Sequence, residues 1–205
     1  MDTRETAGSA FFANERRLAR LIREDWEVNL RDWTQPGFRA LAVHRFGTWA
    51  HQLRFRPIRA VLVRVHRTLF RYVRNHYGIE LPLAALVGRR VQIGHQNGIV
   101  VNPNAVIGDD CIIRHNVTIG TTSVSRIGEA PTIGRGVSLG VGAAILGGIT
   151  IGDRASIGPN TVVIIDVPAD TSVFVGTPRM LKLAKAPATQ MQDPESRLPA
   201  ERAIT

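Results

Sequence analysis

The chain has 205 residues, 44% of them hydrophobic, and a formal net charge of +9 at pH 7. It is long enough to bury a sizeable core, and it contains no apolar run of the length that a membrane-spanning helix needs. The first residues show no basic segment followed by an apolar one, so we expect no secretory signal and a cytoplasmic protein. The single cysteine, Cys111, excludes an intrachain disulfide, which fits a reducing compartment.

Residues 1–10 have no regular pattern, and we expect a flexible N-terminus there. Residues 11–77 place apolar side chains at helical spacing, with breaks at Pro36-Gly37 and at Pro57, which predicts an N-terminal domain of helices. At the other end, residues 181–205 are polar and rich in proline, and we expect a flexible tail.

The positive charge is concentrated in residues 1–76, which hold 15 arginines and seven acidic residues. No acidic residue occurs between Phe46 and His76, and this stretch carries the arginines Arg54, Arg56, Arg59, Arg64, Arg67, Arg71 and Arg74. A solvated helix face is one interpretation. The other is an anionic partner, such as a membrane surface, a phosphate-bearing substrate or carrier, or an acidic protein. Nucleic acid is not expected, because no binding motif or aromatic stacking platform accompanies the charge.

A six-residue repeat occupies the chain between these ends, and it predicts the fold. Each repeat opens with an aliphatic residue that glycine often follows, as in Ile107-Gly, Ile133-Gly and Ile151-Gly. In a hexapeptide solenoid this residue points inward, and three short strands close a coil of roughly 18 residues. The residue four places later also points inward, so Cys111 is interpreted as buried packing. Residues 78–180 are therefore predicted to form a parallel β-helix.

The repeat changes phase twice. Between Ile93 and Val101 it slips by two residues, and between Ile119 and Ile133 the gap is fourteen residues, two repeats plus two residues. The second gap holds the polar segment 121–131, which predicts a loop outside the solenoid wall. Loops on a rigid scaffold often carry functional residues.

His95 lies in Ile93-Gly-His-Gln-Asn-Gly98, at a predicted corner beside the first phase change. Acyl transfer to an alcohol needs a base that takes the hydroxyl proton, and an imidazole does this near neutral pH. A carboxylate behind the ring would hold its tautomer, and Glu80, about one coil earlier, should stack close under this corner. From the repeat alone, a polar corner residue without a chemical role is the first interpretation of His95.

Two other classes of protein fit the repeat less well. A zinc enzyme on such a solenoid would use three histidine ligands, whereas the solenoid offers only His95 and His115, and the latter is interpreted as a polar corner or interface residue. A non-catalytic trimeric scaffold is the second alternative. Loss of acyl transfer on replacing His95 by alanine would separate an enzyme from a scaffold.

From about residue 20 to residue 180, the chain resembles the serine acetyltransferase family of hexapeptide acyltransferases. Three segments carry the resemblance. The first is the helical segment 36–49, and the second is the stretch from Gly78 to Val101, in which an acidic residue precedes a histidine by fifteen positions. The third is Val117-Thr-Ile-Gly-Thr-Thr122, with the loop that follows it and the Pro-x-Ile-Gly at which the repeat resumes. The segment Val175-Gly-Thr-Pro-Arg179 is similar to the family's exit from the solenoid.

This resemblance implies an α+β fold, with N-terminal helices followed by a left-handed parallel β-helix of hexapeptide repeats. It implies a homotrimer, or a hexamer of two trimers, that binds acetyl-CoA in a groove between neighbouring subunits and needs no metal. His95 would be the general base, and Glu80, where the family has aspartate, would orient it. The cofactor-binding residues that it implies are Gly120, Thr121, Gly140, Gly142, Ala143, Gly158 and, from charge alone, Lys182.

The acceptor pocket departs from the family. The implied substrate-binding residues are Gly94, Gly98, Glu129 and Ala130. Family members that bind serine have aspartate in place of Gly94 and Arg-His in place of Glu129-Ala130, and these groups would pair with the ammonium and the carboxylate of serine. The family thus implies O-acetylation of L-serine for cysteine biosynthesis, while this pocket leaves a sugar hydroxyl in polysaccharide biosynthesis open.

Overall fold

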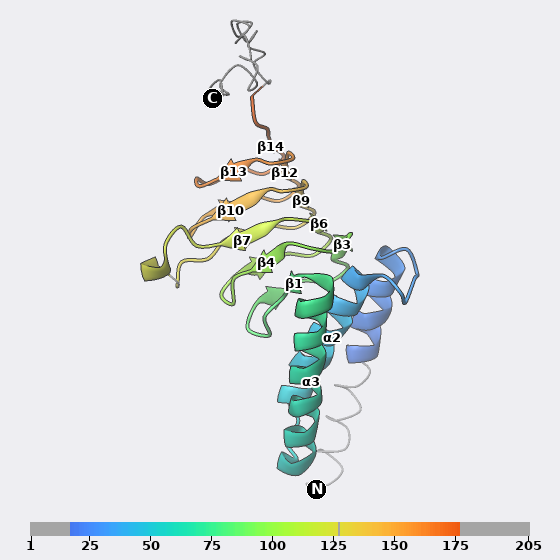
Figure 1. Ribbon diagram of the computed structural model, residues 1–205. Helices are drawn as coiled ribbons and strands as arrows, with labels where there is room; N and C mark the ends of the chain where they lie inside the picture. Colours follow the sequence, from blue (N-terminus) through green and yellow to red (C-terminus); the bar gives the residue numbers. More distant parts are fainter. Residues whose placement is uncertain (1–16, 127, 177–205) are drawn as a thin grey trace, which may run out of the picture. The chain divides into compact units, whose positions relative to one another are not determined.

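The computed structural model describes residues 17–126 and 128–176. The predicted flexible segments 1–10 and 181–205, with Lys182, lie outside this range. Residues 17–126 and 128–175 belong to one compact unit, in which helices precede a solenoid of short parallel strands (Figure 1). The predicted α+β architecture with a left-handed β-helix is confirmed.

Three described helices precede the solenoid: residues 17–28, α2 (Pro36–His51) and α3 (Arg56–Tyr77). Each of the last two begins with a proline in its first turn, where no intrahelical hydrogen bond is lost. Gly78 ends α3 in the left-handed region, at φ 61°, and its N–H donates to the Arg74 carbonyl. No helix in the described ranges is both long and apolar enough to cross a membrane.

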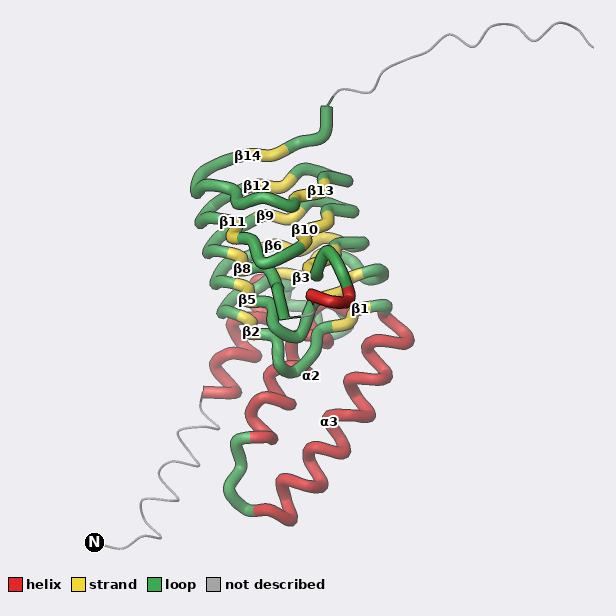
Figure 2. The backbone as a smooth tube through the Cα atoms, turned by 90° about the vertical axis from the view of Figure 1, so that its left-hand side faces the viewer, coloured by secondary structure: helices red, strands yellow, loops and turns green. Residues whose placement is uncertain are grey.

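The described solenoid strands are β1 (Ile79–Glu80), β2 (Leu86–Val87), β3 (Gln92–Gly94), β4 (Ile99–Val101), β5 (Val106–Ile107), β6 (Ile112–Arg114), β7 (Thr118–Gly120), β8 (Thr132–Ile133), β9 (Ser138–Leu139), β10 (Ala144–Leu146), β11 (Thr150–Ile151), β12 (Ser156–Ile157), β13 (Val162–Val163) and β14 (Ser172–Val173). They stack into three parallel sheets, β1-β4-β7-β10-β13, β11-β8-β5-β2 and β14-β12-β9-β6-β3 (Figure 2). We call these sheets A, B and C. The chain passes from A to B to C in every coil.

The strand register shows how the phase changes are accommodated. Ile133 pairs with Ile151, an ordinary coil of 18 residues, whereas Ile79 pairs with Ile99, so the first coil is two residues longer. Ile119 pairs with Ile145, eight residues beyond an ordinary coil. The fourteen-residue gap is therefore one repeat plus an eight-residue insertion, not two repeats plus two. The insertion forms the predicted loop outside the wall and contains a short 3-10 helix, Val124–Arg126.

The inward positions of the repeat form one continuous core along the solenoid. Its fully buried large side chains include Ile107, Ile113, Ile119, Ile133, Leu139, Ile145, Ile151 and Ile157. Cys111 is 0% exposed, and burial raises the pKa of its thiol to about 11. A thiol in that state is a poor nucleophile, so the prediction that Cys111 is buried packing is confirmed.

A buried ion pair fastens the helices to the solenoid. The Arg45 Nε donates to the Asp25 Oδ2 at 2.8 Å, and their side chains are 5% and 0% exposed. The same guanidinium donates to the carbonyl oxygens of Val87, at 2.7 Å, and of Gly88, where β2 ends. One cation thus ties the first helix, α2 and sheet B together.

Candidate active site

One edge of the solenoid, where the chain turns from sheet C into sheet A, carries most of the predicted site residues. Strands β3, β6, β9 and β12 end at this edge, and β4, β7, β10 and β13 begin there. We call it the C–A edge. The predicted site residues that it brings together are Gly94, His95, Gly98, Gly140, Gly142, Ala143 and Gly158.

His95 projects from this edge at the corner that the two-residue phase change enlarges. Its side chain is exposed and its φ is 69°, in the left-handed region that residues with a side chain seldom adopt. Asn97, at φ 79°, and Gly98, at φ 67°, share that conformation. Such backbone strain concentrates at functional sites, because the surrounding structure must hold it. The corner therefore presents an exposed imidazole in a conformation fixed by the coil beneath it.

His115 lies one coil above His95, because Gly94 pairs with Arg114 in sheet C. The two rings meet edge to face, with centroids 5.5 Å apart and an angle of 81° between their planes. The Nδ1 of His115 is buried and has no hydrogen-bond partner among the described residues. Sequence reasoning treated His115 as a polar corner residue. The signal that could have found it was the longer first coil, which stacks residue 115 on residue 95.

Glu80 lies at the same edge, in the coil below. It is half-buried on β1, which begins directly after Gly78, and the Gly78 carbonyl accepts a hydrogen bond of 3.1 Å from the Ile99 N–H. Glu80 pairs with Val100, not with Gly98, because the first coil has two extra residues. In the described chain no hydrogen bond joins the carboxylate of Glu80 to the ring of His95, so its orienting role stays a prediction.

The glycines of the edge fall into two kinds. A Cβ on Gly94 would meet only the Ile113 carbonyl oxygen, at 4.0 Å, so the space beside His95 is open. A Cβ on Gly140 would lie 2.7 Å from backbone atoms of the next coil, and one on Gly158 would lie 2.4 Å from the Phe174 ring. These glycines therefore permit the coils to stack, rather than leaving a groove.

Gly142 and Ala143 also have small side chains because the coils stack closely there. A Cβ on Gly142 would lie 2.2 Å from the Asn160 Oδ1, and the Ala143 side chain is 0% exposed. The missing side chains do not by themselves explain how a pantetheine arm would be admitted. A route for acetyl-CoA along this edge stays a prediction that depends on the backbone and on neighbouring chains.

The remaining predicted residues lie at the opposite edge of sheet A. Gly120 ends β7, and Thr121, Glu129 and Ala130 belong to the loop that leads from β7 to β8 (Figure 1). Because the strands of a parallel sheet all run the same way, the start of β4 and the end of β7 lie at opposite edges. Within one chain, the width of sheet A therefore separates His95 from this loop.

Hydrogen bonds between residues of the loop hold it together. The Thr121 Oγ1 lies 2.9 Å from the Arg126 carbonyl oxygen and 3.1 Å from that of Ser123. The Arg126 guanidinium lies 3.7 Å from the Glu129 carboxylate, and both side chains are mostly exposed. Sequence reasoning missed Arg126, which places a cation beside Glu129, one of the predicted substrate-binding residues. Ala130 is half-buried and packs on the core.

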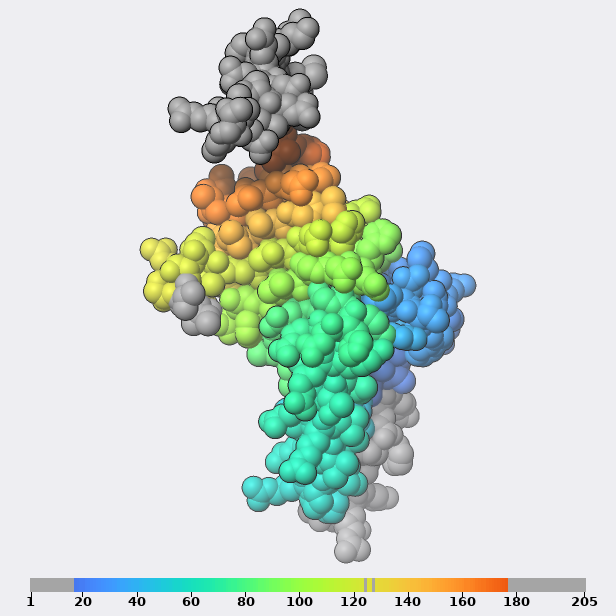
Figure 3. Space-filling model, viewed as in Figure 1, coloured from blue at the N-terminus to red at the C-terminus, as the bar shows by residue number. Residues whose placement is uncertain are grey.

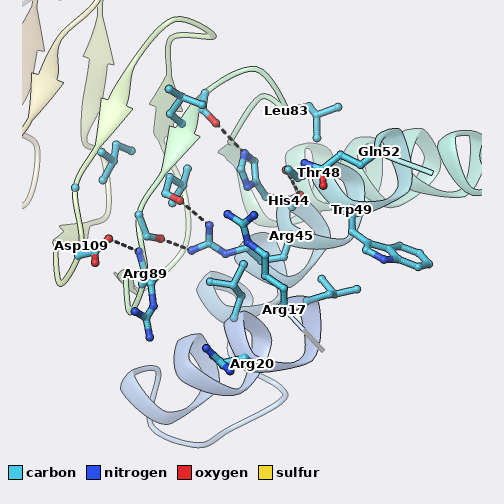
Figure 4. Close-up of a pocket in the computed structure, with 18 of the residues that line it drawn as sticks. Arg17, Arg20, His44, Arg45, Thr48, Trp49, Gln52, Leu83, Arg89 and Asp109 are labelled. Carbon is cyan, nitrogen blue, oxygen red and sulfur yellow. Dashed lines mark hydrogen bonds between the residues drawn. The ribbon is translucent and has the colours of Figure 1, made fainter. Parts of the chain in front are cut away.

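A cavity of about 1110 Å³ lies elsewhere, between the helices and sheet B (Figure 4). None of the predicted site residues lines it. Two of its polar side chains join helix to solenoid: Arg45 donates to the Val87 carbonyl oxygen at 2.7 Å, and the His44 Nε2 lies 3.1 Å from the Ala85 carbonyl oxygen. We therefore assign this cavity to the joint between the helices and the solenoid. Among the described residues, no group of three or more His, Cys, Asp or Glu side chains is placed to hold a metal ion.

A solenoid of hexapeptide repeats with an exposed histidine at a strained corner has the architecture of a hexapeptide acyltransferase. A family model for the bacterial transferase hexapeptide (six repeats) matches residues 130–164. The serine acetyltransferase of Helicobacter pylori is 36% identical over 161 residues, which make up 76% of this chain and 88% of that relative. The chain belongs to the serine acetyltransferase family.

Three further comparisons define the likeness. The serine acetyltransferase of Synechococcus elongatus is 35% identical over 169 residues, covering 80% of this chain and 66% of that relative, just under two thirds of its length. A colanic acid biosynthesis acetyltransferase of Escherichia coli, WcaB, is 42% identical over 109 residues, covering 53% of this chain and 66% of that relative. The crystal structure of Brucella abortus serine acetyltransferase in complex with coenzyme A superposes with a TM-score of 0.69 at 25% identity, covering 84% of this chain and 70% of that one.

Proposed function

We propose that the protein is an acetyl-CoA-dependent O-acetyltransferase that moves an acetyl group to a hydroxyl, with L-serine as the acceptor that its family indicates. The observation that carries the proposal is the exposed His95 imidazole, held at a left-handed corner beside the open space at Gly94. Acetyl-CoA is the second substrate, and the relatives named for serine acetylation support both substrates.

His95 would act as the general base. It takes the proton of the acceptor hydroxyl as the oxygen attacks the thioester carbonyl carbon, which forms a tetrahedral intermediate. The N–H of Gly98, which donates to no other group of the described chain, is available to the oxyanion. When the intermediate collapses, the C–S bond breaks, the acetyl ester remains on the acceptor, and His95 returns the proton to the coenzyme A thiolate. Glu80 would stabilise the imidazolium from the coil below.

The site needs a second chain. The acceptor loop of one protomer cannot reach the His95 corner of the same protomer, because sheet A lies between them. The outer face of this sheet exposes Val100 and Val162, at 44% and 63%, which is the kind of apolar surface that another copy covers. We therefore propose that the site lies between neighbouring protomers of a homotrimer, and that two trimers form a hexamer. The protein would act in the cytoplasm. Lys182 would meet the phosphates of coenzyme A.

A sugar hydroxyl is the second candidate acceptor. Three positions lack the groups expected to bind a free amino acid, namely Gly94, Glu129 and Ala130. The likeness to WcaB, at 42% identity, supports an acceptor in polysaccharide biosynthesis. Against this, Arg126 stands 3.7 Å from Glu129 and supplies a cation that could turn to a serine carboxylate. The geometry of the loop thus keeps serine as the first candidate.

The arginines of α3 support a peripheral contact with an anionic membrane or an anionic carrier. None of them forms an ion pair with another described residue, whereas Arg90, Arg135 and Arg154 of the solenoid each pair with an aspartate. Unpaired cations of this kind attract an anionic surface in a salt-dependent way. Sedimentation with phosphatidylglycerol vesicles should show binding that is lost at high salt. Absence of binding at low salt would remove this contact.

The acceptor test supplies acetyl-CoA with L-serine and, separately, with nucleotide-linked or lipid-linked sugars, and follows the release of free coenzyme A thiol. Serine turnover with kcat/KM above about 10⁴ per molar per second, in the usual range for enzymes, would support the serine assignment. Turnover of a sugar without turnover of serine would move the acceptor to the second candidate. A His95→Ala variant should lose activity with whichever acceptor is used, by about 10²-fold or more. Unchanged turnover in that variant would favour the scaffold.

A further inference from the structure

Helix α3 carries an apolar stripe that no described part of the chain covers. Ile58, Val61, Val65, Leu69 and Tyr72 recur at intervals of three and four residues, which places them on one face of the helix. Their exposed fractions range from 39% for Leu69 to 61% for Val61. The stripe is distinct from the face that carries the buried His66 and Val73 and packs on α2.

The stripe follows the heptad pattern of a helix that packs on other helices. Ile58, Val65 and Tyr72 fall on the first position of successive heptads. Val61, Thr68 and Asn75 fall on the fourth, and Leu69 falls beside it on the fifth. β-Branched residues at both positions favour parallel assemblies of three or more helices over pairs. A threefold axis also requires equivalent helices to run parallel. The pattern therefore fits three copies of α3.

The position of α3 agrees with such an assembly. The helix leads directly into β1, the first strand of sheet A, and lies on the same side of the compact unit as that sheet (Figures 1 and 2). Its surface is turned to the viewer in Figure 3, below the solenoid. Sheet A itself exposes Val100 and Val162. Sheet A and the helix that leads into it thus both expose apolar side chains.

The charge of α3 does not oppose this packing. At 100° per residue, Arg64 and Arg71 lie about 100° or more around the helix from the centre of the stripe, and Arg67 lies nearly opposite it. Stripes can therefore meet while the guanidinium groups stay in solvent. A helix lying flat on lipid with the same stripe downward would turn Arg67 away from the headgroups. The arrangement favours other copies over a bilayer as the cover of the stripe.

We propose that the α3 helices of three protomers pack through this stripe around the threefold axis and form a helical stem below the solenoids. The stem would hold neighbouring solenoids at the separation at which the loop of one chain meets the His95 corner of the next. The inference rests on the homotrimer of the proposed function, and it assigns that assembly a surface outside the solenoid.

The test compares two variants of the full chain by size-exclusion chromatography with light scattering. Val61→Lys combined with Val65→Lys puts two like charges per chain into the stem. Ala60→Lys combined with Thr150→Lys adds the same charge at exposed positions off the stripe. We expect the first variant to keep its helical circular dichroism and to need at least about tenfold more protein to remain trimeric. The second should assemble like the wild type.

A third variant tests the stem by a gain of stability. Thr68 is the one polar residue among the heptad positions from Ile58 to Tyr72, and it is exposed. Thr68→Ile should lower the protein concentration at which the trimer half-dissociates, because an isoleucine there would be buried between helices. In a monomer the same change would leave an isoleucine in water and would strengthen no assembly.

Each outcome decides between the stem and an alternative. A wild-type trimer that survives both stripe lysines, and that gains nothing from Thr68→Ile, would overturn the stem and leave a trimer held by the solenoids alone. A wild-type monomer would overturn both the stem and the homotrimer. Stripe variants that stay trimeric but lose binding to phosphatidylglycerol vesicles would assign the stripe to lipid and contradict the proposal.

Discussion

The ring of His115 stands edge-on to the ring of His95, with centroids 5.5 Å apart, and so forms one wall of the corner that carries the candidate base. Aromatic pairs of this geometry contribute about 0.5–1.5 kcal/mol beyond the area they bury. The contact therefore limits the rotamers that the exposed His95 side chain can adopt. We therefore infer that His115 acts through the base that it contacts, as a positioning residue.

Replacing His115 by alanine should lower kcat by about threefold to tenfold, since the loss of the pair frees the His95 ring. The KM for acetyl-CoA should stay unchanged, because no part of the proposed coenzyme site is removed. Steady-state kinetics with both substrates varied would separate the two constants. His115→Phe, which keeps an edge-to-face partner, should restore most of kcat. A rise in both KM values with kcat intact would assign His115 to binding.

The ion pair between Asp25 and Arg45 should be a main support of the joint between the helices and the solenoid. Asp25→Asn leaves the guanidinium, 5% exposed, without its counter-charge. Breaking a buried pair in this way lowers the free energy of unfolding by about 3–5 kcal/mol. Urea denaturation would measure it. Asp170→Asn, which breaks the exposed pair with Arg154, is the matched control and should change stability little. Equal effects of the two substitutions would refute the assignment.

His44 should make the stability of the fold depend on pH. Burial lowers the pKa of this ring from 6.5 to about 4 in the folded protein. The unfolded chain therefore binds more protons between these two values, and the stability present above pH 6.5 falls as the pH drops toward 4. Between pH 7 and pH 5 this group alone should remove about 2 kcal/mol.

The measurement is urea denaturation at both pH values for the wild type and for His44→Gln. Glutamine does not titrate, and its amide can still donate to the Ala85 carbonyl that the His44 ring contacts. The variant should therefore lose about 2 kcal/mol less than the wild type over this interval. Parallel losses in the two proteins would show that His44 is protonated in the folded state or accessible to water.

The solenoid could be predicted from the sequence because the repeat reports packing directly. Every sixth residue must be aliphatic to stack in the core, and Ile133, Leu139 and Ile145 are each at most 1% exposed, as the period requires. The loop after Gly120 was predictable for the same reason, since a polar segment out of phase cannot enter the core. The exposure of His95 followed from its place at a corner.

The neighbours of His95 could not be predicted in the same way. They follow only when the two residues of the phase change are counted into the first coil, which stacks residue 115 on residue 95. The register of the first coil pairs Glu80 with Val100 and brings His115 next to His95. Asp25 and Arg45 show a different limit. They lie on different helices, and helical periodicity carries no information about which acid would meet Arg45.

The most direct test of the central claim mixes two inactive chains. One carries His95→Ala, and the other has residues 123–128 of the loop replaced by two glycines. In a cyclic oligomer whose sites each combine the corner of one protomer with the loop of its neighbour, random mixing in equal amounts gives about a quarter of the sites both intact parts. After joint unfolding and refolding, coenzyme A release should recover to about a quarter of the rate of wild-type protein treated identically. No recovery in the mixture, while the wild type refolds to full activity, would contradict a site shared between protomers.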